Sequence, residues 1–210
     1  FREQVGQGLE YSSVILPLNE NAFLGALQTE ALASGRRPDC ADWAQGGADA
    51  LVEGVLRHEG MRVSVEYQVW DTARCVSLAR ARIARSELEL SLLARLVADA
   101  VVGAFTGSPG VSATELAFVS DRGGEREVFV MDADGGRQRA ATRGASIKAF
   151  PDWMPDGKAI LYTSYQSRNQ PGLFLTSRGE VRAGQILESV LPGLPKYRGV
   201  FDPSGEHLAM

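Results

Sequence analysis

The sequence has few residues of the kinds that form catalytic or metal centres. Its 210 residues include only two histidines and two cysteines. Neither His58 nor His207 has a partner cysteine or carboxylate at metal-ligand spacing, and the Gly-x-Ser-x-Gly elbow of serine hydrolases does not occur. We therefore expect no enzyme activity, no cofactor and no metal site in this chain.

Excess positive charge and long apolar runs are also missing. The 22 Lys and Arg face 26 Asp and Glu, for a formal charge of −4, and no basic run argues for nucleic-acid binding. The longest apolar stretches are far shorter than the roughly 18 residues that span a bilayer, which argues against membrane insertion. With 44% hydrophobic residues, the chain has the composition of an ordinary globular protein.

The two cysteines leave the compartment open. Cys40 and Cys75 could form a disulfide in an exported protein, or remain free thiols in a cytosolic one. The sequence begins at Phe1 without a visible signal peptide, so we expect an export signal to be removed or absent.

The pattern of residues changes near a Gly-Ser-Pro-Gly cluster at 107–110. Helical and strand patterns alternate before it, whereas short strands and Gly/Pro/Asp turns follow it. We expect an α/β domain over 1–107, a linker over 108–114 and an all-β domain over 115–210.

Two patterns in the first domain are strong. Period-two alternation over 61–70 predicts a strand with one buried face, and the apolar phase of the returning strand, 75–84, shifts between Leu78 and Ala79, which predicts a β-bulge. The other predicted elements are a helix over 1–10, a strand at Val14–Leu16, a helix from Asn19 or Asn21 that includes Leu32, a short helix from Asp42 and a strand over 50–56.

A capping box predicts the start of the longest helix. Ser86 and Glu89 can satisfy each other's backbone N–H groups, and Gly107 suits the left-handed position at the helix end. From the apolar spacing we expect Leu96 and Val101 to be buried, and Arg95 and Asp99 to be exposed or near the domain boundary.

The second domain repeats itself. Residues 115–120 (ELAFVS) recur as 159–164 (AILYTS), and 128–131 (VFVM) recur as 173–176 (LFLT), shifts of 44 and 45 residues. A period in the forties made of short strands and turns is typical of a β-propeller. About 100 residues supply two blades and the start of a third, too few for a closed ring. We therefore expect a piece of a longer protein.

A third recurrence marks structural positions. The repeated segment contains Asp152, Trp153, Pro155, Asp156 and Gly157, and Pro203 and Gly205 return 48 residues after Pro155 and Gly157. Repeat positions mainly build stacked cores, so we expect Trp153 to fill space between blades and Asp156 to make a turn. Asp132-Ala133-Asp134-Gly135 offers too few carboxylates for calcium and predicts a hairpin turn.

The motifs DWAQGGADALVEGVL, LARLVADAVVGAFTGSPGV, LAFVSDRGGEREVFVMDADGG and PDWMPDGKAILYTS, in this order, resemble the TolB family of periplasmic β-propeller proteins. The resemblance implies a partial propeller, six-bladed when complete, located in the periplasm. It also implies a non-catalytic scaffold of the Tol-Pal system that binds the lipoprotein Pal and TolA and is monomeric at full length. Such a scaffold maintains outer-membrane integrity and supports outer-membrane invagination during division.

This chain departs from the family pattern in places. The signal peptide, the TolA-binding segment and the first strand are not seen, and Met154 replaces a usual serine. Which residues contact Pal or TolA is not predicted.

An alternative from another class is the gating propeller of a prolyl-oligopeptidase-type hydrolase. That alternative requires a further α/β-hydrolase domain carrying Ser, Asp and His in this order. The α/β domain that precedes the repeats favours the scaffold.

Overall fold

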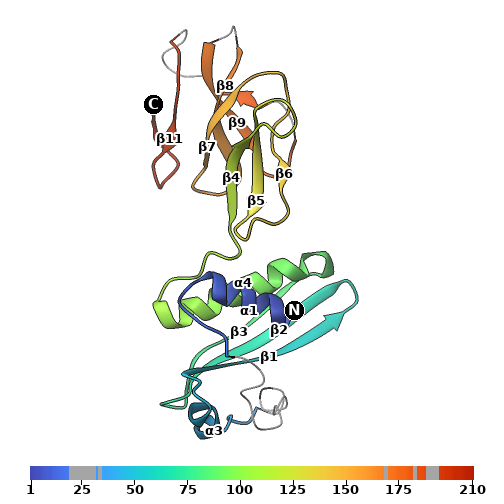
Figure 1. Ribbon diagram of the computed structural model, residues 1–210, viewed down its shortest axis with the longest axis vertical. Helices are drawn as coiled ribbons and strands as arrows, with labels where there is room; N and C mark the ends of the chain where they lie inside the picture. The colour runs from blue at the N-terminus through green and yellow to red at the C-terminus, as the bar shows by residue number, and fades with distance from the viewer. Residues whose placement is uncertain (19–31, 33–34, 168–169, 182–183, 188–193) are drawn as a thin grey trace. The chain divides into compact units, whose positions relative to one another are not determined.

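The computed structural model describes residues 1–18, 32, 35–167, 170–181, 184–187 and 194–210. It divides into two compact units, Phe1–Ala113 and Thr114–Met210 (Figure 1). No helix in the described part of the chain is long and apolar enough to cross a membrane.

The first unit is a three-stranded antiparallel sheet with the first and last of its helices, α1 and α4, on one face (Figure 1). The strand order is β1-β2-β3, so the middle strand is also the middle one in sequence. Its elements are α1 (Arg2–Tyr11), α3 (Cys40–Gln45), β1 (Ala50–Glu59), β2 (Arg62–Asp71), β3 (Val76–Ser86), the 3-10 helix η2 (Glu87–Glu89) and α4 (Leu90–Thr106).

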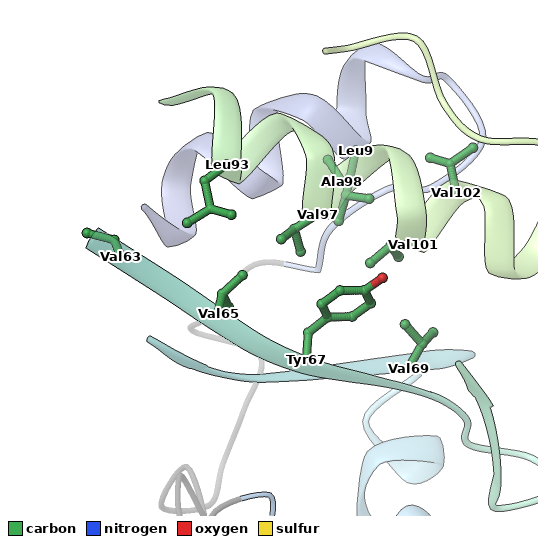
Figure 2. Close-up of a cluster of buried hydrophobic side chains, with 10 residues drawn as sticks. All are labelled: Leu9, Val63, Val65, Tyr67, Val69, Leu93, Val97, Ala98, Val101 and Val102. Atoms are coloured by element: carbon green, nitrogen blue, oxygen red, sulfur yellow. The ribbon is translucent and has the colours of Figure 1, made fainter. Parts of the chain in front are cut away.

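Period-two alternation builds the core of this unit. The alternate residues of β2 from Val63 to Val69 are at most 5% exposed and face α4 (Figure 2). Val69 pairs with Ala79 and Trp70 with Ser77, so Leu78 is the extra residue of a β-bulge. The predicted strand and its bulge are confirmed.

The capped helix is confirmed at both ends. The Ser86 and Glu89 capping box is present, with Ser86 N donating to Glu89 Oε2 at 3.3 Å, and Gly107 ends the helix at φ 79°. A single turn of 3-10 helix, η2, precedes the α-helical part, which begins at Leu90.

The predicted exposure of this helix is partly wrong. Val101 is fully buried, but Leu96 is only half-buried. Arg95 and Asp99 are not exposed, at 8% and 7%, but both contact Ser112 next to the boundary between the units, the other predicted location. The reason is that α4 contacts α1 as well as the sheet, so its buried surface is wider than one apolar stripe.

Asp99 is buried because the chain returns to it after the helix. Its carboxylate accepts hydrogen bonds from Ser112 Oγ at 2.6 Å, Ser112 N at 2.7 Å and Ala113 N at 2.8 Å. Residues 108–113, treated above as linker, thereby pack on α4 within the first unit.

One predicted strand is absent. Val14–Leu16 lies in irregular structure, with Val14 56% and Leu16 80% exposed, and belongs to none of the described sheets. A strand needs a partner to take up its backbone hydrogen bonds, and an apolar triplet does not specify one. The helix predicted from Asn19 or Asn21 lies outside the described residues except for Leu32, which is buried.

The regular elements described in the second unit are all β-strands, and its sheets follow one another along the chain. The described strands form a three-stranded sheet β4-β5-β6, a four-stranded sheet β10-β9-β8-β7 and a pair β11-β12, all antiparallel. The strands are β4 (Glu115–Ser120), β5 (Glu127–Asp132), β6 (Arg139–Ala140), β7 (Lys148–Trp153), β8 (Ala159–Ser167), β9 (Gln170–Ser177), β10 (Gln185–Ile186), β11 (Val200–Phe201) and β12 (Leu208–Ala209).

The first two of these sheets share a core. Val128 and Val130 of β5 pack with Ile160 and Tyr162 of β8 and Phe174 of β9. Successive antiparallel sheets that bury a face against the next one, without closing a barrel, are the architecture of a partial β-propeller. The predicted fold class, an α/β domain followed by this architecture, is confirmed.

Two glycines of α1 offer a matched pair of substitutions. A Cβ on Gly8 would lie 2.7 Å from Ala98 Cβ and 3.2 Å from Ser112 Oγ, whereas nothing lies within 4 Å of a Cβ on Gly6. We expect Gly8→Ala to lower the free energy of unfolding by about 1–3 kcal/mol through overpacking. Gly6→Ala should raise it by about 0.5–1 kcal/mol through helix propensity. Urea unfolding measures both changes, and equal effects would contradict the close contact between α1 and α4.

Candidate functional site

The repeated positions form a tight turn between β7 and β8. Gly157 N donates to Met154 O at 2.8 Å, and Gly157 has φ 66°. Pro155 is the second residue of this four-residue turn, where its fixed φ fits, and Asp156 is the third, with Oδ1 accepting from Lys158 N at 3.0 Å.

The second copy adopts the same turn between β11 and β12. Gly205 N donates to Asp202 O at 2.9 Å with φ 73°, and Pro203 takes the place of Pro155. Ser204 replaces Asp156, and its Oγ accepts from Glu206 N at 3.2 Å. Two copies 48 residues apart therefore build equivalent hairpins from different side-chain acceptors.

Each turn contains an aspartate whose surroundings stabilise its charged form. The pKa of Asp156 lies below its ordinary 3.8 because the Lys158 backbone N–H donates to it, and that of Asp202 is lowered mainly by the Ser204 hydroxyl. Stability linked to a lowered pKa is present above the unfolded value and lost as pH falls through the folded value. Carboxyl NMR titration should find both groups titrating below 3.8, and Ser204→Ala should raise the pKa of Asp202 alone.

Asp152 and Trp153 lie at the end of β7, just before this turn. Asp152 pairs with Leu161 and Trp153 with Ile160 across the sheet. The Trp153 ring packs against the core shared by the two sheets, with Arg178 Cζ 5.9 Å from its centre. The environment of Trp153 is that of a packing residue between sheets.

The Asp132–Gly135 segment is a turn whose carboxylates have protein partners. Asp132 accepts two hydrogen bonds from Arg137, at 2.6 and 2.7 Å, which raise the pKa of the guanidinium. Asp134 Oδ1 accepts from Gly136 N at 2.8 Å. Among the described residues, no cluster of His, Cys, Asp and Glu is arranged to hold a metal ion.

Each of the two histidines lies beside one carboxylate. His58 Nε2 lies 3.1 Å from Glu87 Oε1, and His207 Nδ1 lies 3.2 Å from Asp202 Oδ2. Both histidine side chains are more than half exposed, so these are surface pairs and not buried acid–base machinery.

A buried ion pair joins the first two sheets of the second unit, and sequence reasoning missed it. Lys148 of β7 is 1% exposed, and its Nζ lies 2.9 Å from Oε1 of Glu127 of β5. Thr142 Oγ1 and Gly144 N also donate to the Glu127 carboxylate, at 2.5 and 2.8 Å. Lys148 is the first residue of β7, and no local sequence pattern predicts that a lysine at this position is buried.

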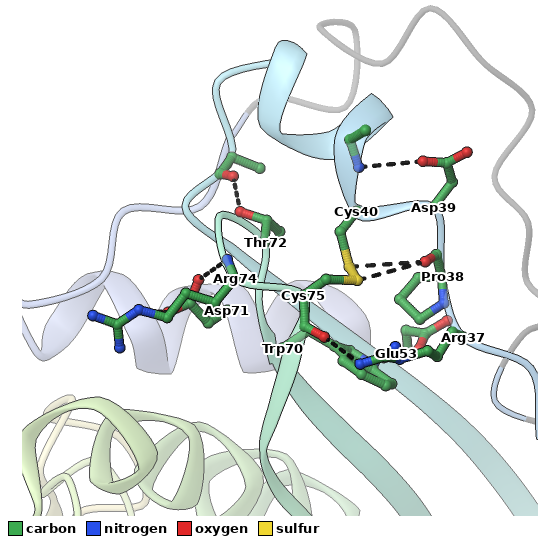
Figure 3. The surroundings of a disulfide bond; sticks show 12 residues. Arg37, Pro38, Asp39, Cys40, Glu53, Trp70, Asp71, Thr72, Arg74 and Cys75 are labelled. Atoms are coloured by element: carbon green, nitrogen blue, oxygen red, sulfur yellow. Dashed lines mark hydrogen bonds and ion pairs between the residues drawn. A yellow bond between two sulfur atoms is a disulfide. The ribbon is translucent and has the colours of Figure 1, made fainter.

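The cysteines are joined. The Cys40–Cys75 disulfide connects the start of α3 to the turn between β2 and β3, with Cα atoms 5.6 Å apart (Figure 3). Persistent disulfides form in oxidising compartments, so the bond bears on where the protein functions.

The described residues thus offer rigid turns and packed sheets, and no assembly of catalytic groups. Residues 5–78 match the family described as the TolB amino-terminal domain. A Tol-Pal system protein TolB from Albidiferax ferrireducens is 35% identical over 139 residues, 66% of this chain and 33% of that protein. Another, from Syntrophotalea carbinolica, is 30% identical over 153 residues, 73% of this chain and 35% of that protein.

A solved structure shares the fold. The crystal structure of TolB from Acinetobacter baumannii superposes with a TM-score of 0.77 and 21% identity, covering 99% of this chain and 50% of that one. The chain spans about a third of the length of these curated relatives.

Proposed function

The chain belongs to the TolB family, and on that premise we propose that it is part of a non-catalytic, protein-binding scaffold of the Tol-Pal system. Its partners are the lipoprotein Pal and TolA. Through them the scaffold maintains the outer membrane and supports its invagination during cell division.

The observation that carries this proposal is the order of the two units. An α/β unit that matches the TolB amino-terminal domain is followed directly by sheets of a partial propeller. Propellers host many functions, so the repeats alone would not choose among them. The preceding unit is the specific part of the match.

The disulfide supports a periplasmic location. The Cys40–Cys75 disulfide is stable in an oxidising compartment, whereas most bacterial cytosols would keep the two cysteines reduced. The periplasm is the oxidising compartment in which a Tol-Pal protein would meet its partners.

Recognition in such a scaffold depends on rigid loop positions. The hairpin turns at 154–157 and 202–205 are held by backbone hydrogen bonds and by side-chain acceptors at the same places. The first two sheets pack through a common core that holds the turn at 154–157 in place, so that a partner binds without ordering this turn first.

Deleting the gene in the source bacterium tests the proposal. We expect leakage of periplasmic enzymes, detergent sensitivity and chained cells, all reversed by a plasmid copy. A copy carrying Gln7→Ala, at an exposed position of α1 outside these turns, should restore the wild type. An intact envelope in the deletion strain, together with no co-purification of Pal or TolA with the tagged full-length protein, would overturn the proposal.

The hydrolase alternative has no supporting observation. The relatives compared above are named Tol-Pal system proteins, and the described residues contain no nucleophile paired with a base at an elbow. Labelling of the full-length protein by a serine-reactive fluorophosphonate would revive that alternative.

A further inference from the structure

A hollow of about 680 Å³ lies beside the disulfide of the first unit. Its walls come from three places in the sequence: residues 36–39, helix α3 and the turn between β2 and β3 at 72–75. We call this cavity and the residues that line it the disulfide hollow.

The disulfide hollow is positively charged in an acidic chain. Arg36, Arg37 and Arg74 line it against the single carboxylate of Asp39, whereas the whole chain carries −4. Asp39 Oδ1 already accepts from Ala41 N at 3.2 Å.

Two of the arginines are placed to meet a ligand. Arg37 Nη2 donates to Cys75 O at 2.8 Å, which holds the side chain while using one of the five N–H donors of a guanidinium. The Arg74 side chain is 80% exposed, and its Nε lies 3.9 Å from Asp71 Oδ2, a long surface ion pair of the kind that contributes little energy. Figure 3 shows the two guanidiniums well apart, with that of Arg37 next to Cys75 and that of Arg74 extending past Asp71, away from the disulfide.

The walls between the arginines are tied down. The disulfide joins Cys40 to Cys75, and Thr72, 3% exposed, donates from Oγ1 to Ala48 O at 2.5 Å. The remaining lining is small and apolar, including Pro38, Ala41, Ala44 and Ala73. A rigid site loses little conformational entropy when a ligand binds.

We propose that the disulfide hollow binds an acidic, extended segment of a partner protein. Carboxylates of the segment pair with Arg37 and Arg74, and its backbone and aliphatic groups cover the small apolar lining between them. An extended segment fits because the two guanidiniums lie well apart and do not converge on one point. This inference goes beyond the proposed function, which assigns no binding surface to the first unit.

The test uses the whole chain and a fluorescein-labelled hexaglutamate peptide as probe. Fluorescence anisotropy measures its affinity for the wild type, for Arg37→Gln with Arg74→Gln, and for Arg126→Gln with Arg143→Gln. The last pair removes the same charge from exposed positions of the second unit. We expect about a tenfold loss of affinity in the first double variant and less than about twofold in the control.

Three results would overturn the proposal: no binding of the peptide, an equal loss in both double variants, or equal binding of a hexaglutamine peptide. Binding of inorganic phosphate or of anionic lipid vesicles at the same arginines, with no binding of the peptide, would reassign the hollow to phosphate groups and also overturn it. None of these results bears on the envelope phenotype of the deletion strain, so the two proposals fail separately.

Discussion

Replacing Cys40 and Cys75 by alanine is expected to lower the free energy of unfolding of the first unit by about 4 kcal/mol. The bond closes a loop across a sequence separation of 35 residues that includes β1 and β2. Constraining a loop of that length in the unfolded chain gives a stabilisation of this size in the chain-entropy account.

Hydrogen exchange in the whole chain measures this effect unit by unit. Amides of β2 should lose protection in the Cys40→Ala, Cys75→Ala variant, while amides of β8 should keep theirs, because the two strands belong to different units. A reductant should produce the same loss in the wild type and none in the variant. A destabilisation below about 1 kcal/mol would show that the bond contributes little beyond covalent connection.

Replacing Lys148 by alanine is expected to cost the second unit roughly 3–5 kcal/mol, because it leaves the Glu127 carboxylate buried without a countercharge. The lysine is 1% exposed, and the Glu127 side chain is 13% exposed. The substitution also removes a contact between β5 of the first sheet and β7 of the second. Hydrogen exchange of the β8 amides measures this loss in the second unit alone.

Two further variants separate the charge from the packing. Lys148→Met combined with Glu127→Gln removes both charges and keeps similar volumes, so it should recover most of the loss. Lys158→Ala removes a lysine that is 83% exposed and pairs with Asp156 at 3.4 Å, and it should change stability by at most about 1 kcal/mol. A loss in Lys148→Ala no larger than in Lys158→Ala would contradict the role of the buried pair.

The sequence predicts the repeated turns but not the hollow beside the disulfide. The turn residues at 155–157 and 203–205 are recognisable from sequence because a tight turn restricts backbone angles at those residues alone. The disulfide hollow could not be predicted from the sequence. Its walls at Arg37 and Ala73 are 36 residues apart and meet only when β3 folds back on β2.

What the sequence determined by itself is what short-range physics controls. The alternation of β2, the bulge at Leu78, the capping box at Ser86 and the repeated turns each depend on residues within a few positions of one another. The repeat period added the class of the second unit, because each blade is one local meander.

The tertiary structure alone decided how distant groups are paired. Val14–Leu16 has no strand partner among the described residues, and Arg95 and Asp99 are buried although helix periodicity places them on the polar face. Cys40 is bonded to Cys75, and Lys148 forms an ion pair with Glu127. In each case the energy of a polar, charged or backbone group depends on a partner that is distant in sequence, and composition and periodicity carry no information on which partner arrives.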